Sequence, residues 1–496
     1  MESIGYEYLR VQLGLSAFPV IHPVRIRPVS RVLDTSDELQ VPRPVAPKTG
    51  HPLDHLLFAL KYEGINLQIL AEVMPRVSGE DMIARLRESP TGAYIRKACY
   101  LWEWLAGAEL VDIPAVAGPY EPLFDPANYV TGGCRRNTKW RINFNGIGSE
   151  AYCPTVRLTQ VIKEGIAGDV IARTKAFLDS LGPTNADRAL SWAYLSETDS
   201  SFAIERETPN QNKAEAFVAL LQQAHERQPL TEDYLSDLQS ATMTNPFEKA
   251  ASFRREQNWL RSGGLRGTSS VTYVPPSPEL LAQLMPAFMA MANDLPKQID
   301  PIAAAAVASF GFVFLHPFMD GNGRLSRFLF HQALCQSGRL ARGLLLPVSV
   351  AMKRQEAEYL EALQSFSAPA RKLWKVTWVD EDRFDLKFNG ADAIYRYWDA
   401  TPCVEFAYRM AEQALDVDLR QETEFLARFD RIAIALNDAF DVRSNDQHLL
   451  IVSALQNGGK VSNNRRKKLA DRVPEEVFEF VERLAMKELA GLPKEE

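Results

Sequence analysis

The sequence predicts a mainly α-helical protein with a few short strands, on three observations. Apolar residues recur at helical spacing over residues 53–73 and 94–105, and again in several segments between 156 and 238. An almost continuous apolar run at 300–315 is long enough for a buried helix. Strand-like patterns are confined to two short stretches, around residues 258–276 and 384–388, each of which suggests a β-hairpin.

Composition is that of a soluble globular protein. Of 496 residues, 46% are hydrophobic and 24% are charged, which is enough for two or three domains. The net charge of -7 gives no overall attraction to nucleic acid or to anionic membranes. Five scattered cysteines form no C-x-x-C pair, and no apolar run could span a bilayer. We therefore expect a cytoplasmic protein without a membrane segment.

Residues 1–190 are predicted to be an N-terminal arm followed by a helical region. Six prolines between positions 19 and 47 favour an extended arm on the surface over residues 1 to about 50. Helices follow from residue 53, with a break at Gly64. The Gly- and Pro-rich stretch at 114–154 is interpreted as a long irregular connection, because no strand-then-helix pattern frames its glycines as a phosphate loop.

Beyond residue 370 we expect two further parts. Residues 371–440 are predicted to form a hairpin and helices that pack on the central part of the chain. Residues 441–496 are predicted to form a small helical module whose middle helix carries Arg-Arg-Lys-Lys at 465–468. A winged-helix or helix–turn–helix module is one interpretation, but a solvated basic helix is favoured because four charges alone do not read bases.

The most informative stretch is residues 316–327, which read His-Pro-Phe-Met-Asp-Gly-Asn-Gly-Arg-Leu-Ser-Arg. The apolar helix at 300–315 is expected to deliver His316 out of the core at its C-terminal end. Pro317 cannot continue that helix, so a loop must follow. His316 titrates near neutral pH and can accept a proton from an attacking hydroxyl.

The loop is predicted to end at a helix N-terminus. Gly321 and Gly323 permit backbone conformations closed to other residues, and Asn322 is a suitable N-cap for a helix over 325–335. A helix N-terminus presents unpaired N–H groups and partial positive charge, and glycines let a ligand approach the backbone closely. The loop is therefore a candidate anion-binding site.

Charged side chains around this loop suit a polyphosphate. Arg324 and Arg327 stand three apart on the new helix, so we expect them at neighbouring surface positions where they hold successive phosphates. Asp320 is a hard oxygen ligand suited to Mg²⁺. A helical corner with a capping Asn and solvated arginines explains any one of these residues, but structure alone does not require all of them together.

The motif resembles the signature of the Fic family, His-Pro-Phe-x-Asp/Glu-Gly-Asn-Gly-Arg-x-x-Arg, at every fixed position. The resemblance covers about residues 196–366 and implies a Fic catalytic core at 191–370 with a β-hairpin flap near 258–276. It implies a protein adenylyltransferase that moves AMP from ATP with Mg²⁺ to a Tyr, Ser or Thr hydroxyl of a target protein, including its own chain. A homo-oligomer remains open.

The same resemblance gives the motif residues roles. It implies that His316 is the catalytic base and that Asp320 holds the metal. It implies that the nucleotide is bound by Gly321, Asn322, Gly323, Arg324 and Arg327.

A second segment resembles the inhibitory helix of many Fic proteins, with the pattern Ser/Thr-x-x-x-Glu-Gly/Asn. Ser201 and Glu205 match it and share a helix face, whereas Arg206 departs from Gly or Asn. The resemblance implies that Glu205 pairs with Arg327 and excludes the γ-phosphate. A solvated pair of side chains four residues apart is the plain alternative.

Three other functions remain as alternatives. Phosphoryl transfer, as in the Doc branch, is disfavoured by Gly323, since that branch has Lys there. Removal of AMP from a modified protein, with Glu205 orienting water, is not separated from transfer by the sequence. A DNA-binding regulator acting through the C-terminal basic helix conflicts with the intact motif.

Overall fold

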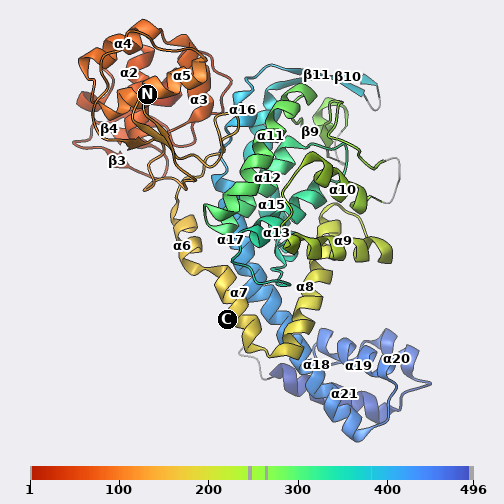
Figure 1. The fold of residues 1–496 in the computed structure, drawn as a ribbon. Helices are drawn as coiled ribbons and strands as arrows, with labels where there is room; N and C mark the ends of the chain where they lie inside the picture. The colour runs from red at the N-terminus through yellow and green to blue at the C-terminus, as the bar shows by residue number, and fades with distance from the viewer. Residues whose placement is uncertain (1–2, 244–247, 263–265, 381–382, 491–496) are drawn as a thin grey trace.

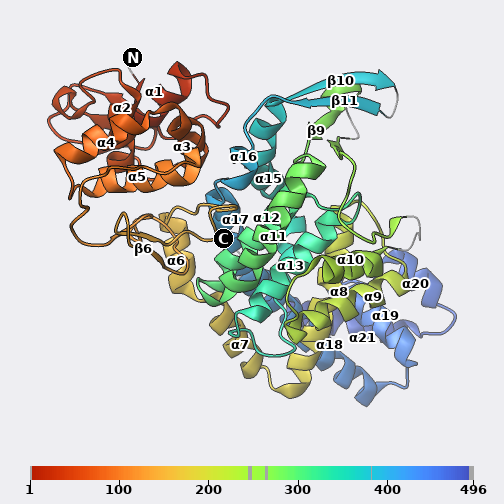
Figure 2. The same cartoon turned by 45° about the horizontal axis from the view of Figure 1, so that its top comes forward.

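The computed structural model describes residues 3–243, 248–262, 266–380 and 383–490. The fold is mainly helical with small sheets, as the sequence predicted. An N-terminal unit lies at one end, a central group of helices in the middle, and a C-terminal bundle at the other end (Figures 1 and 2). Within the described ranges, no helix is both long and apolar enough to cross a membrane.

The prediction of an extended N-terminal arm is wrong, because residues 5–12 form a helix. Helix α1 (Gly5–Gln12) contains no proline and packs the buried Tyr6 and Leu9 against α2 (Pro52–Tyr62). The proline-rich residues after it contribute to a sheet of order β1-β2-β4-β3. Its strands are β1 (Ser3–Ile4), β2 (Val24–Ile26), β3 (Leu33–Asp34) and β4 (Leu39–Val41).

The predicted helices of the N-terminal unit are confirmed, with the break at Gly64. They are followed by a connection that is mostly irregular but holds a small sheet, β5-β7-β6, which the sequence did not reveal. Two of its glycine segments pack closely, since a Cβ on Gly132 would lie 2.9 Å from the Gly146 carbonyl oxygen. The elements are α3 (Leu67–Val73), α4 (Gly79–Glu88), α5 (Ala93–Ala106), β5 (Glu121–Pro122), β6 (Arg135–Asn137) and β7 (Ile142–Phe144).

The segment between residues 156 and 242 is helical, as predicted, and the first predicted hairpin is present. Strands β8 (Leu260–Arg261) and β9 (Val271–Tyr273) pair antiparallel and form a short flap. Helix α11 (Pro278–Asp294) follows. The helices before the flap are α6 (Gln160–Gly168), α7 (Val170–Ser180), α8 (Pro183–Ile204), α9 (Gln211–Gln223) and α10 (Glu232–Thr242).

Helix α12 (Pro301–Leu315) lies at the centre of the molecule and is buried on all sides except at Val313. Asp300 caps it by accepting a hydrogen bond from the Ile302 N–H at 3.0 Å. Its alanines let neighbouring helices approach closely, while Phe314 packs on Phe366 with ring centroids 4.5 Å apart. Around it lie α11, α13 (Asn322–Gln336), α15 (Glu356–Lys372) and α17 (Thr401–Gln413), while α14 (Val348–Arg354) packs on α8 and α17.

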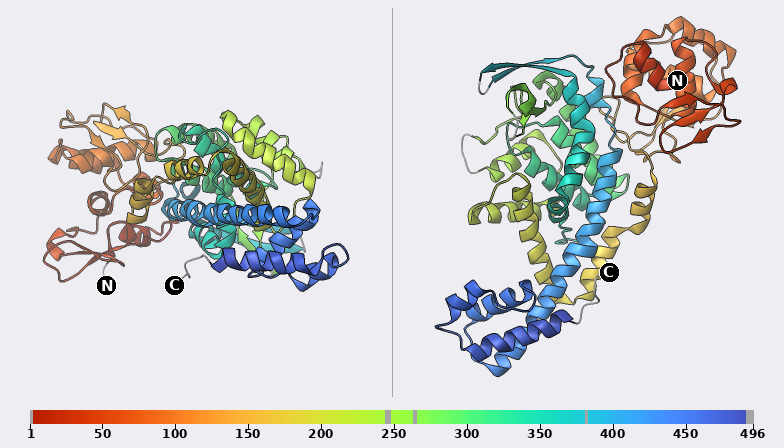
Figure 3. Two further views of the ribbon diagram at one scale, coloured as in Figure 1. Left: turned by 90° about the horizontal axis from the view of Figure 1, so that it is seen from below. Right: turned by 180° about the vertical axis from the view of Figure 1, so that it is seen from behind.

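The second predicted hairpin is formed by β10 (Trp374–Asp380) and β11 (Arg383–Phe388). After α16 (Ala393–Arg396) and α17, a π-helical turn at Ala414–Leu419 leads directly into α18 (Arg420–Ala439), which runs into the C-terminal bundle (Figure 3). That bundle adds α19 (Ser444–Gln456), α20 (Asn463–Leu469) and α21 (Glu475–Ala490), the three predicted helices. Between residues 441 and 490 the structure has no strand, so a wing is not present there.

Apolar side chains gather in separate clusters along the chain. The largest spans positions 147 to 419, another lies mainly in the N-terminal unit, and a third is shared by α18, α19 and α21. The four-part division at residues 190, 370 and 440 stays a prediction, because clusters show where side chains pack and not which parts fold independently.

We expect Gly311→Val in α12 to lower the free energy of unfolding by about 1–3 kcal/mol. Even the Cβ of a new side chain at this position would lie 2.8 Å from Tyr152 Oη and 3.2 Å from the Phe288 ring, and the two methyl groups of valine need still more room. Urea unfolding measures the loss. Gly168→Val in α6 is the control, since its new atoms meet the flexible Glu412 carboxylate, and an equal loss at both positions would contradict this account.

Candidate active site

His316 forms the C-cap of α12 and is held in a strained backbone conformation. Its φ of 51° lies in the left-handed region, and its N–H donates to the Phe312 carbonyl at 2.8 Å. The prediction that it leaves the core is wrong, because the residue is only 8% exposed. The motif loop and its neighbours close over the ring, so His316 is buried at the edge of the core.

The hydrogen bond of the imidazole defines its reactive nitrogen. Nδ1 lies 3.1 Å from the Val313 carbonyl oxygen, which can only accept, so Nδ1 carries the proton. In the neutral ring Nε2 is then the free base. Burial, with a smaller contribution from the positive charge of Arg254, lowers the pKa of His316 to about 4, although the hydrogen bond to Val313 and the charges of Glu205 and Asp320 oppose the shift. The ring is therefore neutral at pH 7 and able to accept a proton.

Arg254, which the sequence analysis missed, fixes the backbone around His316. Its guanidinium donates to the carbonyls of His316 at 2.8 Å, Glu256 at 3.0 Å and Pro276 at 2.5 Å. Its own N–H donates to the Pro317 carbonyl at 2.8 Å. This buried residue thus joins the histidine to both ends of the flap. Nothing local in the sequence marks it, since its partners are backbone groups distant along the chain.

The loop 316–323 is fixed from within by Asn322. The predicted N-cap role of Asn322 is wrong: Gly321, with a φ of 83°, is the N-cap of α13, and Asn322 is the first helical residue. The Asn322 side chain instead accepts from the Phe318 N–H at 3.0 Å and donates to the Phe318 carbonyl at 2.8 Å. The Asn322 side chain thus closes the loop with two hydrogen bonds to one residue, as a pair of backbone groups would. Its oxygen does not cap α13, so the N–H groups at the start of that helix can bind another acceptor.

The two motif arginines lie inside the protein and not at surface positions, contrary to the prediction. Arg324 and Arg327 are 3% and 1% exposed, because α8 and α9 cover this face of α13. Arg324 lies 3.4 Å from the Glu207 carboxylate and above the Phe202 ring. Burial lowers the pKa of Arg327, but the charges of Glu205, Tyr359 and Glu197 and the hydrogen bond to Glu205 together outweigh burial, so the pKa is raised.

Arg327 contacts both residues of the second predicted segment. Its Nε donates to Ser201 Oγ at 2.7 Å, and its Nη2 donates to the Ser201 carbonyl at 2.8 Å and to Glu205 Oε1 at 2.9 Å. Glu205 also lies against Gly323, where any Cβ would overlap its carboxylate. The structure therefore brings Ser201, Glu205 and Arg327 together at the N-terminus of α13.

Arg206, which departs from the family pattern, keeps the backbone conformation that the pattern requires. Helix α8 ends at Ile204, Glu205 is its C-cap, and Arg206 has a φ of 60°. Gly and Asn adopt this left-handed region more readily than other residues. Arg206 adopts it too, so the chain turns at the same point and Glu205 remains directed at α13.

One turn further along α13, a buried polar cluster connects three helices. His331 Nε2 lies 2.7 Å from Glu197 Oε1, and Ser349 donates to the same carboxylate from its N–H at 2.8 Å and its hydroxyl at 2.5 Å. Glu197 and Ser349 are 0% exposed and His331 is 2% exposed. The sequence analysis did not single out these residues.

The predicted magnesium ligand, Asp320, fits a metal that is shared with a nucleotide. Its side chain is 55% exposed, and its Oδ1 accepts from the Gly321 N–H at 2.6 Å. Within the described residues no group of three or more His, Cys, Asp or Glu could hold a metal alone. Mg²⁺ is commonly bound by one or two carboxylates together with substrate phosphates, so a single exposed carboxylate beside an anion site fits this ion.

Residues 229–334 match the model of the Fic/DOC family. The match runs from the segment before α10 through the flap, α12 and the motif to the end of α13. This region of the chain is therefore similar to the Fic/DOC family. The motif loop, His316 and both arginines lie inside the matched region, whereas Ser201 and Glu205 lie before it.

Curated relatives of the Fic domain are protein adenylyltransferases. A stretch of 113 residues is 34% identical to "Protein adenylyltransferase Fic" of Drosophila willistoni, covering 23% of this chain and 19% of that protein. The protein of the same name in Nematostella vectensis is 39% identical over 83 residues, or 16% of this chain and 19% of the relative. The chain thus spans about a fifth of the length of these relatives.

Solved structures of Fic proteins are also similar at a low level. A Fic family protein from Desulfovibrio desulfuricans is 18% identical with a TM-score of 0.37, and the similarity covers 66% of this chain and 89% of that one. Fic-1 from C. elegans is 18% identical with a TM-score of 0.34, covering 74% and 92%.

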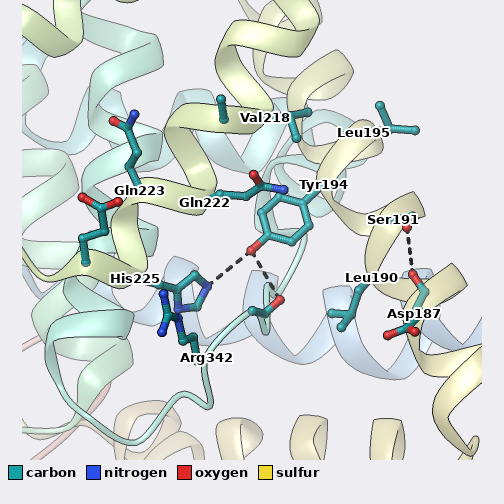
Figure 4. A pocket seen from close by; sticks show the side chains of 13 residues that line it. Asp187, Leu190, Ser191, Tyr194, Leu195, Val218, Gln222, Gln223, His225 and Arg342 are labelled. Carbon is teal, nitrogen blue, oxygen red and sulfur yellow. Dashed lines mark hydrogen bonds between the residues drawn. The ribbon is translucent and has the colours of Figure 1, made fainter.

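A cavity of about 830 Å³ lies away from the motif, between α8, α9 and the turn at Ala224–Glu226 (Figure 4). Tyr194 Oη projects into it, 3.3 Å from both His225 Nε2 and the Gly343 carbonyl oxygen. None of the residues 316–327 lines this cavity, so it is not part of the candidate active site.

The lowered pKa of His316 predicts a specific pH dependence of stability. An unfolded histidine has a pKa of about 6.5, so between that value and about 4 the unfolded chain binds a proton that the folded chain does not. Stability should therefore be unaffected by this residue above about pH 6.5 and fall by up to about 3 kcal/mol on acidification to about pH 4. Urea unfolding across this range should show a weaker decline for His316→Gln; equal declines would contradict the assignment.

Proposed function

We propose that this protein transfers AMP from ATP to a hydroxyl side chain of a protein target. The observation that carries the proposal is the arrangement around the N-terminus of α13: a neutral histidine, a glycine loop and two buried arginines. A helix N-terminus with close backbone approach and two guanidinium groups suits a polyphosphate. The similarity to protein adenylyltransferases supports the same conclusion.

In the proposed reaction, His316 is the general base. Nε2 takes the proton of a Tyr, Ser or Thr hydroxyl as its oxygen attacks the α-phosphorus of ATP. A bond forms between that oxygen and the α-phosphorus, the bond to the bridging oxygen of the β-phosphate breaks, and pyrophosphate leaves. His316 is suited to this role because its ring is neutral and its tautomer is fixed by Val313.

The other motif residues bind and orient the nucleotide. The N–H groups at the start of α13, with Arg324 and Arg327, hold phosphate oxygens and neutralise the charge that develops during transfer. Asp320 would hold Mg²⁺, which would polarise the phosphates and neutralise part of their charge. Catalysis on this account is mainly positioning and charge neutralisation.

We further propose that the enzyme is restrained by its own α8. Arg327 donates to Ser201 and Glu205, so a γ-phosphate would have to displace these acceptors to reach it. The Glu205 carboxylate also lies against Gly323, at the positive end of α13. ATP must therefore compete with an internal anion for the same arginine and the same helix end.

Labelled ATP tests the reaction directly. We expect label from the α-phosphate, and not from the γ-phosphate, to enter protein when the purified chain with Glu205→Gly is incubated with ATP, Mg²⁺ and a cell lysate. His316→Ala in that background should reduce incorporation by about 10²-fold or more, because the base is lost. Incorporation of γ-label would instead indicate phosphoryl transfer, and transient loss of AMP from an already modified protein would indicate the reverse reaction.

Release of Arg327 should activate the enzyme. Glu205→Gly is expected to raise AMP transfer, including self-modification, by roughly 10²–10⁴-fold, since a phosphate-clamping arginine contributes on that order. Arg327→Ala on top of it should abolish the gain. Asp199→Gly is the control, because this exposed residue of α8 carries the same charge and its replacement by glycine costs at least as much helix stability as a replacement at the C-cap. Equal activity of both single variants would contradict the restraint.

A further inference from the structure

Helices α8 and α13 run antiparallel and meet at a repeat of four residues, with hydrogen bonds at two levels and the Glu205 carboxylate lying against Gly323 at the third. On α8 the participants are Glu197, Ser201 and Glu205, and on α13 they are Gly323, Arg327 and His331. Positions four apart lie on one face of a helix, so the contacts form three successive rungs. The first two rungs involve the site residues, whereas the third, Glu197 with His331, does not contact the motif loop.

The third rung is about as deeply buried as the second and much more deeply buried than the first. Glu197 is 0% exposed and receives hydrogen bonds from Ser349 and His331, whereas the Glu205 side chain is 36% exposed. A buried carboxylate is costly unless its oxygens are paired, and a well-packed apolar pair would hold two helices together at least as well. Packing alone therefore does not account for these three side chains.

What a hydrogen-bonded carboxylate adds to packing is a fixed register. An apolar contact tolerates sliding by a fraction of a turn, but a carboxylate held by three donors from two helices does not. His331 lies on α13 and Ser349 on α14, so Glu197 is fixed from two directions. His331 Nδ1 has no hydrogen-bond partner within the described part of the chain. Within that part, the imidazole is therefore oriented by its hydrogen bond to Glu197.

Glu205 depends on such a fixed point because it lies at the end of its helix. It is the C-cap of α8, and helix ends fray more readily than helix centres. The anchor at Glu197 lies two turns earlier, about 12 Å along the axis at 1.5 Å per residue. A slide or rotation of α8 at Glu197 would carry Ser201 and Glu205 away from Arg327 together.

We propose that Glu197, His331 and Ser349 are positioning residues that hold α8 in the inhibitory register and thereby keep Glu205 on Arg327. This inference rests on the proposed function and extends it from the inhibitory pair to these three buried residues, which we call the latch. None of them belongs to the motif at 316–327. Weakening the latch should activate the enzyme while making it less stable. If the cluster has only a structural role, the same variants do not gain activity, because an enzyme that is destabilised without release of inhibition is unchanged or less active.

The test compares Glu197→Gln with Thr198→Val in the full-length chain. Gln keeps the shape, but its amide nitrogen cannot accept, so at least one donor from His331 or Ser349 loses its partner. Thr198 is equally buried, and its hydroxyl bonds only within α8, to the Tyr194 carbonyl at 2.8 Å. Ser349→Ala is a milder second variant, which keeps the question answerable if Glu197→Gln does not fold.

We expect Glu197→Gln and Ser349→Ala to raise α-label transfer from ATP by about tenfold or more, since one hydrogen bond to a charged group shifts the balance between inhibited and released states by about that factor. Both should lower the melting temperature. Thr198→Val should lower the melting temperature without raising transfer. ATP binding, measured by calorimetry, should tighten in the two latch variants only.

The double variants separate this inference from the proposed function. In a Glu205→Gly background, Glu197→Gln should give no further gain, because both changes release the same arginine. If Glu205→Gly is active but the latch variants behave like Thr198→Val, the latch is overturned and the proposed function stands. If Glu205→Gly itself transfers no AMP, the proposed function fails and the latch fails with it.

Discussion

The buried guanidinium of Arg327 is the constraint on which the rest of the site depends. A permanent charge that is 1% exposed must be paired, and in this structure its partners are a hydroxyl, a carbonyl and a carboxylate from the end of α8. Phosphate oxygens would satisfy the same group equally well. The arginine therefore requires an anion, and the fold supplies one from its own chain.

The same physical argument applies to the N-terminus of α13. Unpaired N–H groups and the helix dipole favour a negative group there, and Glu205 lies against Gly323 at that end. A binding site for phosphate and a binding site for an inhibitory carboxylate thus have the same electrostatic requirements. This equivalence is the physical basis of our proposal that a single glutamate both completes the folded structure and opposes the nucleotide.

His316 is positioned by a separate set of contacts. Helix α12 is buried along nearly its whole length, and Arg254 connects its last residue to the ends of the flap through four backbone carbonyls. The strained φ of His316 persists because these contacts over-determine it. His316 is thus held by the core and by the ends of the flap, whereas Arg327 is held by the end of α8.

The sequence by itself determined the helical class, most element positions and the motif, because periodicity, glycines and prolines act locally. It identified Ser201 and Glu205 only by resemblance, and it placed His316, Arg324 and Arg327 too far toward solvent. Burial of the two arginines depends on α8 and α9 covering α13, a contact between segments more than a hundred residues apart. Arg254 and the Glu197–His331–Ser349 cluster were decided by tertiary structure alone, since their partners come together only when distant helices pack and carry no spacing that a linear pattern could reveal.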